Sequence, residues 1–262
     1  MTTMAHTRRT FLATAAAAGA ITILPYAARA EGHASDVFEA EGGPITVHPV
    51  AHASFVMETP AGVIYVDPVG DPAIYSGFPK ADLILVTHEH GDHFNVETLA
   101  ALKGEAHLIT NPAVAEKLPD DMKPDEALAN GESTTWNGVA IDAIPAYNIT
   151  EERKQFHPEG RDNGYVLSLD GFRTYISGDT EDTPEMRALR DIDLAFLCMN
   201  LPFTMDASAA ASAVKEIGPS YVYPYHYRGR DGGSQDPAEF ANMVGGAAEV
   251  KMGAWYDEPP KS

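Results

Sequence analysis

A short apolar run at residues 81–86 ends directly in a cluster of titratable side chains. The run reads ADLILV, which is typical of a buried strand, and the next eight residues read THEHGDHF. Strands usually end in turn residues, whereas several imidazoles and carboxylates packed together cost stability unless they share a partner such as a metal ion. The cluster therefore indicates a metal site at the end of a buried strand, on a rigid sheet scaffold.

The spacing inside this cluster suggests two adjacent metal sites. His88 and His90 are two residues apart, so at a strand end their side chains share one face and both imidazoles can point at one ion. Asp92 and His93 lie beyond Gly91, which allows a sharp turn, and they can face a second ion close by. The alternative interpretation is a solvated loop in which histidines occur by chance.

The rest of the chain supplies a scaffold for such a cluster. Strand-like runs come first, a mixture of strands and helices follows, and this order occurs about twice. Helix-like segments lie at 95–102, 113–118, 206–217 and 237–244, and Asp206 and Gly218 are placed to begin and end the third. We expect one α/β domain at 44–262, with two sheets and outer helices, preceded by a flexible leader at 31–43.

The N-terminal stretch 1–30 resembles a twin-arginine signal peptide rather than part of a fold. Arg8 and Arg9 precede a mild apolar run that is too short to span a bilayer, and Ala28–Ala30 fits a small-x-small cleavage pattern. The expected partner is therefore the twin-arginine export machinery, and the expected location is the periplasm. No later apolar run is long enough to leave a stable membrane anchor after signal cleavage.

Charge and cysteine content exclude other classes of protein. The formal net charge is −20, which makes binding to nucleic acid or to an anionic membrane unfavourable, so we expect a small-molecule substrate and no nucleic-acid partner. Cys198 is the only cysteine. Internal disulfides are therefore excluded, and its apolar surroundings, DLAFLCM, predict a core position. The sequence leaves the oligomeric state open.

Four stretches of the chain resemble a known family. HEHGDH at 88–93 is similar to the HxHxDH motif of the metallo-β-lactamase superfamily of metallohydrolases, and further similar segments are VAHASFVMETPAGVIYVDP at 50–68, YISGDT at 175–180 and YPYHY at 223–227. The resemblance is closest to a branch of uncharacterised metal-dependent hydrolases that includes ascorbate-lactonase-like proteins. It implies an α/β fold, an αββα sandwich of two mixed β-sheets flanked by helices, with the metals at one edge.

The resemblance also implies a set of metal ligands. Two histidines would bind one ion, three residues would bind the other, and one carboxylate would bridge them: His88 and His90, then Asp92, His93 and His226, and finally Asp179. Asp92 would also orient the nucleophile as the catalytic residue. The sequence agrees, because Asp179 and His226 each follow a strand-like run. The alternatives are a turn aspartate and a core histidine.

One position departs from the family pattern. A third histidine usually follows the strand that corresponds to 139–144, but this chain has Asn148 there, in PAYNI. An amide oxygen is a weak ligand for zinc, which prefers nitrogen and sulfur. His157 lies nine residues later in an expected loop and is the candidate replacement. The alternative for His157 is an exposed loop histidine.

Further residues are expected to surround the metals. His52, in the opening hairpin, is expected to orient a ligand or to contact the substrate, with a structural role as the alternative. Asp67 is expected to hold the histidine loop through hydrogen bonds, and Tyr227 flanks the site beside His226. The segments 145–163 and 228–234 are expected to set specificity, and 199–206 to line the pocket floor.

These observations predict a metal-dependent hydrolase with two divalent metal ions, zinc foremost and manganese or iron as alternatives. A metal-bound hydroxide would cleave an ester, lactone or phosphodiester bond of a small molecule. One alternative is an iron-dependent oxidoreductase, similar to the sulfur dioxygenases on the same fold. Another is a non-catalytic periplasmic metal-binding protein, although ligands spread over distant strand ends favour a rigid catalytic site.

Overall fold

The computed structural model describes residues 35–229 and 235–256, so the expected signal peptide at 1–30 lies outside the described part. The flexible leader predicted at 31–43 is wrong in part, because Asp36–Ala40 form a strand, β1, that pairs antiparallel with β2 (Gly43–Ala51). The physical reason is Phe38. Its buried ring packs against Phe172 and Tyr221 of the second sheet, and this apolar contact holds β1 at the edge of the first.

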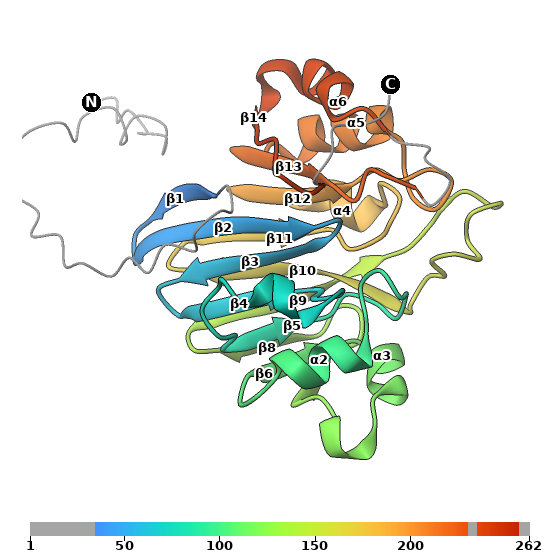
Figure 1. Cartoon of the computed structure of the whole chain (residues 1–262). Coiled ribbons are helices and arrows are strands. Elements are labelled where there is room, and N and C mark those ends of the chain that lie inside the picture. The colour runs from blue at the N-terminus through green and yellow to red at the C-terminus, as the bar shows by residue number, and fades with distance from the viewer. Residues whose placement is uncertain (1–34, 230–234, 257–262) are drawn as a thin grey trace, which may run out of the picture. The chain divides into compact units, whose positions relative to one another are not determined.

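Two seven-stranded sheets lie at the centre of the molecule, and each is formed by one half of the chain (Figure 1). The first has the order β1-β2-β3-β4-β5-β6-β7, and beyond β2 it contains β3 (Ser54–Thr59), β4 (Gly62–Val66), β5 (Leu83–Leu85), β6 (His107–Thr110) and β7 (Glu126–Ala127). The second has the order β14-β13-β12-β11-β10-β9-β8, with β8 (Ser133–Trp136), β9 (Val139–Ala146), β10 (Asp162–Leu169), β11 (Phe172–Ile176), β12 (Leu194–Cys198), β13 (Tyr221–Tyr225) and β14 (Glu249–Val250).

Both sheets change from antiparallel to parallel pairing in the same way. Strands β1 to β4 pair antiparallel and β4 to β7 pair parallel. The second sheet repeats the pattern, antiparallel from β8 to β11 and parallel from β11 to β14. Parallel neighbours need long crossover connections, which explains why helices follow the hairpins in each half. The predicted αββα sandwich is confirmed.

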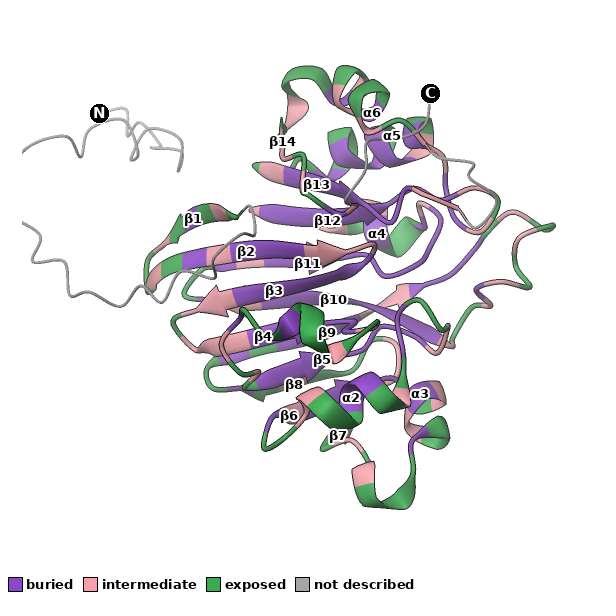
Figure 2. Ribbon diagram, viewed as in Figure 1, coloured by how far each residue is buried: buried purple, intermediate pink, exposed green. Residues whose placement is uncertain are grey.

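The core lies between the two sheets and consists of their apolar side chains (Figure 2). At its centre the rings of Phe55 from β3 and Phe196 from β12 stack with centroids 4.1 Å apart, and Trp255 packs edge-on against both. Cys198 is fully buried here, as predicted. Burial raises the pKa of its thiol to about 12, so this cysteine is a neutral core residue.

The helices pack outside the sheets and present exposed residues to solvent (Figure 2). They are α2 (Val96–Leu102), α3 (Pro112–Lys117), α4 (Pro184–Ala188), α5 (Ala207–Ile217) and α6 (Pro237–Val244), with short 3₁₀ turns η1 (Pro72–Tyr75), η2 (Asp120–Met122) and η3 (Gly245–Ala247). The predicted ends of α5 are confirmed: the side chain of Asp206 accepts a hydrogen bond from the backbone of Ala209, and Gly218 is left-handed at φ 66°. Among the described residues, no helix is long and apolar enough to span a membrane.

The strand ends that carry the predicted site residues meet at one edge of the sandwich. β5 ends shortly before His88, β11 before Asp179, and β13 directly before His226. β9 and β10 also meet at this edge, because Ala146 pairs with Asp162. The loop between these two strands therefore has to leave and return beside the other strand ends, which brings residues 147–161 to the same place.

Candidate metal centre

The structure brings together the histidine cluster after β5 and residues from three other strand ends. The predicted ligands come from these positions: His88, His90, Asp92 and His93 after β5, His157 between β9 and β10, Asp179 after β11, and His226 after β13. Five of them are buried, namely His88, His93, His157, Asp179 and His226. Buried ionisable groups at this density require partners, and the arrangement of their atoms shows what those partners are.

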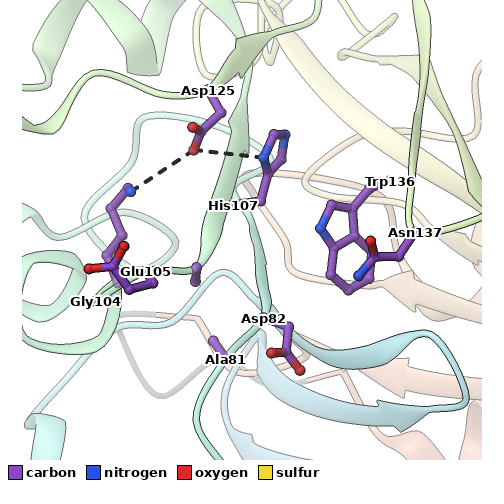
Figure 3. Close-up of a pocket in the computed structure, with 10 residues that line it drawn as sticks. Ala81, Asp82, Gly104, Glu105, His107, Asp125, Trp136 and Asn137 are labelled. Atoms are coloured by element: carbon purple, nitrogen blue, oxygen red, sulfur yellow. Dashed lines mark ion pairs between the residues drawn. The ribbon is translucent and has the colours of Figure 1, made fainter.

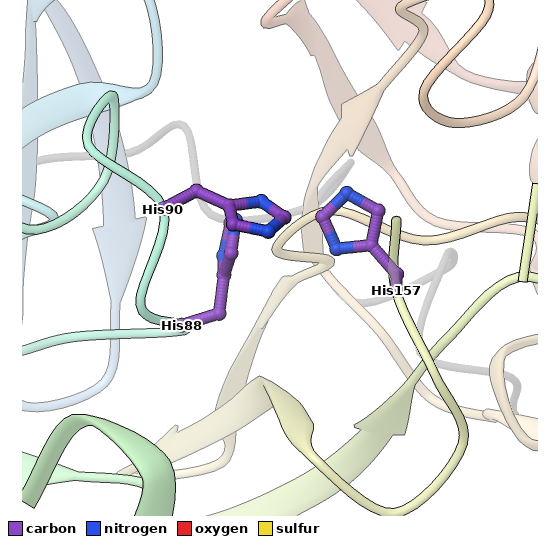
Figure 4. A group of neighbouring side chains, drawn as sticks. All are labelled: His88, His90 and His157. Carbon is purple, nitrogen blue, oxygen red and sulfur yellow. The ribbon is translucent and has the colours of Figure 1, made fainter. Parts of the chain in front are cut away.

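Three histidines form the first wall of the centre, which we call the trihistidine group: His88, His90 and His157 (Figure 4). Each offers a ring nitrogen, and these nitrogens lie within 4.8 Å of one another. The ring of His157 is 5.1 Å from that of His88 and 4.7 Å from that of His90, measured between centroids. His157 is 1 % exposed, so it is not the solvated loop histidine of the alternative interpretation.

Asn148 has a different part in this wall. Its side-chain nitrogen donates hydrogen bonds to the backbone oxygens of Arg153 and Phe203, at 3.0 and 2.7 Å. Its backbone N–H donates to the backbone oxygen of His157 at 2.9 Å. Both the side-chain amide nitrogen and the backbone N–H of Asn148 are thus bonded within its own surroundings. It fastens the loop that carries His157, and His157 takes the place next to the other two histidines.

The carboxylate of Asp179 lies among four imidazoles. Its Oδ1 is 3.3 Å from Nε2 of His93, and its Oδ2 is 3.5 Å from Nε2 of His157 and 3.4 Å from Nε2 of His226. The distance from Oδ2 to Nε2 of His88 is 4.0 Å. Asp179 also forms a potential metal-binding group with His88 and His93. This central position is the one that a bridging carboxylate requires.

A second wall consists of His52, Asp92 and His226, which we call the mixed group. Oδ2 of Asp92 lies 3.4 Å from Nε2 of His52 and 3.3 Å from Nε2 of His226. The rings of His52 and His226 are 4.0 Å apart. His52 comes from the β2–β3 turn and has a left-handed backbone, with φ 54°. Its ring is therefore itself a member of this group and does not merely contact one of the ligands from outside.

Two of the buried histidines are oriented by one aspartate at the end of β4. Oδ2 of Asp67 lies 2.7 Å from Nδ1 of His93, and it also accepts a hydrogen bond of 2.7 Å from the hydroxyl of Thr87. That hydroxyl is 3.0 Å from Nδ1 of His88. Both rings therefore place the Nδ1 proton outward and the Nε2 atom inward, as expected when an outer carboxylate fixes the tautomer of a metal ligand. This is the contact expected of Asp67.

The other two buried histidines have outer partners that the sequence analysis missed. Nδ1 of His157 is 3.0 Å from Oδ2 of Asp162, and Arg161 holds the same carboxylate through its Nε and Nη2 atoms. Nδ1 of His226 is 3.0 Å from the side-chain amide of Asn200. Asp162 begins β10 and Asn200 follows β12. Neither position gives a local signal for such a role, since the contacts depend on how distant segments pack.

The pKa values of His88, His90 and Asp179 are shifted in directions that suit cation binding, and that of His93 is not. Burial and the neighbouring His93 lower the pKa of His88 well below its usual value, and burial also lowers the pKa of His90. His93 is the opposite case: burial opposes its charge, but Asp179 and Asp67 raise its pKa. Burial likewise opposes the ionisation of Asp179, yet His226 and His93 hold its pKa well below the usual range. A neutral imidazole and an ionised carboxylate are the forms that bind metals.

Several buried polar atoms at the centre have no hydrogen-bond partner in the protein. Among the predicted ligands they are Nε2 of His88, Nε2 of His93 and Oδ1 of Asp179, and the side-chain oxygens of Asn148 and Asn200 nearby also lack a partner. Orphaned atoms of this kind are rare and costly in a folded protein. In both histidines Nδ1 has an outer partner, so the unpartnered atom is the inner Nε2. The residues therefore fit a cation, because a bound ion would satisfy these imidazole nitrogens and the Asp179 oxygen.

A pocket of about 750 Å³ opens over the centre. The described residues that line it include members of both walls and several neighbours: His52, His90, Gly91, Asp92, Phe156, His157, Asp179, Asn200, Phe203, His226, Arg228, Gly229 and Tyr256. Tyr227 is not among them. It is buried, and its ring packs edge-on against that of Tyr256 at 4.9 Å, so it supports the wall from behind.

A second pocket, of about 460 Å³, lies beside β6 and has a different character (Figure 3). Its acidic Asp125 already contacts basic neighbours, because Oδ2 of Asp125 is 3.9 Å from Nζ of Lys103 and 4.0 Å from Nδ1 of His107. The lining residues precede β5 and β6 or lie in turns, at the opposite ends of these strands from the histidine loop. No predicted site residue lies there.

Comparison with known proteins agrees with this geometry. The family model of the β-lactamase superfamily domain matches residues 45–226. A UPF0173 metal-dependent hydrolase of Thermococcus kodakarensis is 35 % identical over 176 residues, which are 65 % of this chain and 78 % of the relative. The crystal structure of a candidate metal-dependent hydrolase from Parabacteroides distasonis is 39 % identical, with a TM-score of 0.76, and covers 84 % of this chain and 98 % of that one.

A more distant structure shares the fold alone. The metallo-β-lactamase fold protein YhfI of Bacillus subtilis is 14 % identical, with a TM-score of 0.58 over 78 % of this chain and 89 % of that one. The matched span of the family model contains the histidine loop, Asp179 and His226, which are the residues that the centre brings together. The chain therefore belongs to the metallo-β-lactamase superfamily and, within it, to the UPF0173 metal-dependent hydrolase family.

Proposed function

We propose that the chain is a binuclear metallohydrolase that cleaves an ester, lactone or phosphodiester bond of a small molecule. The observation that carries this proposal is the arrangement of two metal-binding walls around one carboxylate. Nε2 atoms from both walls lie within 4.0 Å of Oδ2 of Asp179, and the buried atoms between them lack protein partners. A lone carboxylate placed in this way reduces the mutual repulsion of two cations.

Each ion would have its own protein ligands. His88, His90 and His157 would hold one ion, Asp92, His93 and His226 would hold the other, and Asp179 would contact both. His52 lies beside Asp92 and His226 and is available to the second ion or to the substrate. When bound, two divalent ions lower the pKa of a water molecule and so supply a nucleophile near neutral pH.

The chain contributes the orientation of that nucleophile through Asp92. Burial opposes its ionisation, but hydrogen bonds with His226 and His52 hold the pKa of Asp92 far below its usual range. Half of its side chain is exposed to the pocket, unlike the buried carboxylate of Asp179. An ionised and accessible carboxylate can accept a hydrogen bond from an attacking water and so orient its lone pair toward the scissile bond.

We further propose that the ions are zinc, with manganese or iron as alternatives, and that the enzyme acts in the periplasm after twin-arginine export. Imidazole and carboxylate ligands suit zinc, and they also suit iron. The ligand set alone does not choose between these metals, because affinity follows a general order and the compartment in which the site is filled decides the outcome. The signal-like N-terminus at 1–30 supports export of a folded chain.

Metal content and hydrolysis, measured together, test this function. The chain is purified without chelators, its metals are counted by elemental mass spectrometry, and chromogenic esters, lactones and phosphodiesters are tested for turnover. We expect two zinc or manganese ions per chain and turnover of at least one substrate class, and we expect Asp92→Asn to abolish that turnover. Metal binding without turnover of any substrate class would favour a metal-binding protein, and two irons with oxygen-dependent activity would favour an oxidoreductase.

A further inference from the structure

The pocket over the metal centre contains a cationic side chain that the hydrolytic reaction itself does not use. Arg228 lies in the segment after β13 and lines the pocket together with members of both walls. It is the one lysine or arginine among the described residues of the lining. The chain as a whole is strongly acidic, with a net charge of −20, so an arginine at this position is not explained by composition.

An aromatic ring fixes the position of this arginine. The guanidinium carbon of Arg228 lies 4.3 Å from the centroid of the Tyr256 ring. The backbone N–H of Arg228 donates a hydrogen bond of 3.2 Å to the hydroxyl of the same tyrosine. Stacking uses the flat face of a guanidinium, while its N–H donors lie in the plane. The contact with Tyr256 is therefore compatible with two parallel hydrogen bonds to a carboxylate or phosphate.

Tyr256 is itself fixed relative to the metal-binding atoms. Its hydroxyl lies 2.8 Å from Nδ1 of His52, a member of the mixed group. Its ring packs edge-on against Tyr227, and the neighbouring Trp255 is joined to the site by a backbone hydrogen bond from His52 at 3.0 Å. Burial raises the pKa of Tyr256, so the ring stays neutral and remains a suitable surface for a cation. The contacts of Tyr256 with both Arg228 and His52 therefore fix the position of Arg228 relative to the mixed group.

A different part of the same pocket is apolar. The rings of Phe156 and Phe203 pack edge-to-face with centroids 5.0 Å apart, and both residues line the pocket. Phe156 comes from the loop between β9 and β10, and Phe203 follows β12. A ligand that reaches both regions would place an anionic group at Arg228 and apolar carbon at the two phenylalanines.

We propose that Arg228 is a specificity residue that binds an anionic group of the substrate, so that the enzyme prefers small organic acids carrying a hydrolysable bond over their neutral counterparts. This inference rests on the proposed hydrolytic function, in which the bond to be cleaved lies at the two ions. Arg228 then binds a second, non-reacting group. Two parallel hydrogen bonds between a guanidinium and an anionic group are charge-assisted, and a neutral counterpart of the substrate cannot form them.

The test compares two esters that share a leaving group and a chain length. They are 4-nitrophenyl hexanoate, whose acyl chain ends in a methyl group, and mono-4-nitrophenyl adipate, whose acyl chain ends in a carboxylate. We expect the wild-type enzyme to favour the adipate ester. In Arg228→Gln the ratio of the two kcat/KM values should fall by about tenfold or more, mainly through KM for the adipate ester.

Arg190→Gln is the matched control. Arg190 is exposed, and its guanidinium donates hydrogen bonds to the backbone oxygens of Arg187 and Leu189. This variant removes the same charge from the protein without touching the pocket, so the ratio should not change. An equal fall of both kcat/KM values in Arg228→Gln would mean that Arg228 only supports the wall, and an unchanged ratio would equally overturn the proposal.

Binding of adipate separates this proposal from the hydrolytic function. If the metal-loaded wild type hydrolyses neither ester, the proposal of ester hydrolysis fails. Arg228 can still be tested by binding: calorimetric titration gives the affinity for adipate, and hexanamide is the neutral ligand for comparison. We expect adipate to bind the wild type and Arg190→Gln alike, and Arg228→Gln about tenfold more weakly. Equal affinity of all three proteins for adipate would overturn the anionic subsite.

Discussion

The trihistidine group and the mixed group both approach the Asp179 carboxylate, yet they are built differently. In the trihistidine group, His88 and His157 are almost fully buried, and their Nδ1 atoms contact Thr87 and Asp162. In the mixed group only His226 is buried. Half of the Asp92 side chain and 23 % of that of His52 are exposed. His90 and His157 also line the pocket, but the trihistidine wall is the more enclosed of the two and the mixed wall the more open.

This difference separates two tasks within one centre. Ligands that are locked by packing and by outer hydrogen bonds hold an ion tightly and in one geometry. Ligands that remain accessible leave room for water and for a substrate at the ion that they bind. The enclosed wall is therefore suited to retaining metal, whereas the open wall is suited to the reaction. Changes in the first wall should act on metal content, and changes in the second on kinetics.

Asp179→Asn should have the largest effect, because it removes the charge that both walls share. Loss of one partner from a buried charge pair costs about 3–5 kcal/mol, which corresponds to about 10²–10⁴-fold in affinity or rate. We expect fewer than two metal ions per chain and no measurable hydrolysis. Asp170→Asn, in the exposed turn between β10 and β11, is the control. Two retained ions in Asp179→Asn would refute a bridging role.

His157→Ala and Asn148→Ala form a matched pair that tests which residue completes the enclosed wall. His157→Ala removes a ring nitrogen from the trihistidine group, so metal affinity should fall by at least about 100-fold, more than for an outer residue. Asn148→Ala removes two hydrogen bonds to the backbone and should lower thermal stability while both ions remain. The reverse outcome, metal loss in Asn148→Ala alone, would restore Asn148 as the ligand.

The sequence predicted those features of the centre that are encoded over short distances. HEHGDH lies within one loop, and Asp179 and His226 directly follow apolar runs, so each was recognisable from a strand end and its polar neighbour. The two halves of the fold were visible for the same reason, since hairpins and crossovers leave local patterns. The choice between Asn148 and His157 was not local. It depends on the hairpin register that pairs Ala146 with Asp162 and folds the intervening loop back over the site.

Features that depend on distant contacts could not be predicted. Tyr256 contacts His52 across 204 residues of sequence, and Asn200 contacts His226 across 26. The five residues of β1, DVFEA, lie within the segment predicted to be a leader. Only the fold reveals that Phe38 has a buried place against the second sheet. Burial of this kind is decided by packing and outweighs local propensity.

Asp162→Asn weakens the enclosed wall from outside. Asp162 is the buried carboxylate beside Nδ1 of His157, and loss of such an outer partner typically costs about 10–100-fold in metal affinity. We expect this loss in competition with a chromophoric chelator. Asp142→Asn serves as the control, because Asp142 also accepts a side-chain hydrogen bond, from Ser133 on the neighbouring strand, but lies outside the centre. Unchanged metal affinity in Asp162→Asn would show that packing alone orients His157.

Acidification should release the two ions in order. Burial opposes the charge of His93, but Asp179 and Asp67 raise its pKa, so a proton competes for its ring at a higher pH than for the other histidine ligands. Burial lowers the pKa values of His88 and His90, so protons compete there only at lower pH. Below the pKa of a ligand, apparent affinity falls about tenfold per pH unit. Metal counts after dialysis between pH 8 and pH 5 should therefore show one ion lost first.

A variant identifies which ion leaves. His90→Ala weakens the enclosed wall, so the ion that the variant protein keeps is the one bound on the Asp92 side. This variant should lose all its metal over the pH interval in which the wild type keeps one ion. Loss of both ions from the wild type over the same pH interval would contradict the distinction between the two walls, because protons would then compete equally for the ligands of both.

Tyr256→Phe should have the smallest effect and should leave metal content unchanged. It removes only the hydroxyl that contacts His52 and Arg228, while the ring remains beneath the guanidinium. One neutral hydrogen bond contributes about 0.5–1.5 kcal/mol, so kcat/KM for a carboxylate-bearing ester should fall by about two- to tenfold. Tyr65→Phe is the control, because the Tyr65 hydroxyl donates to the backbone of Pro79 far from the pocket. A kinetic change that also appears in Tyr65→Phe would reflect general destabilisation, whereas metal loss in Tyr256→Phe would mean that the open wall retains metal as the enclosed wall does.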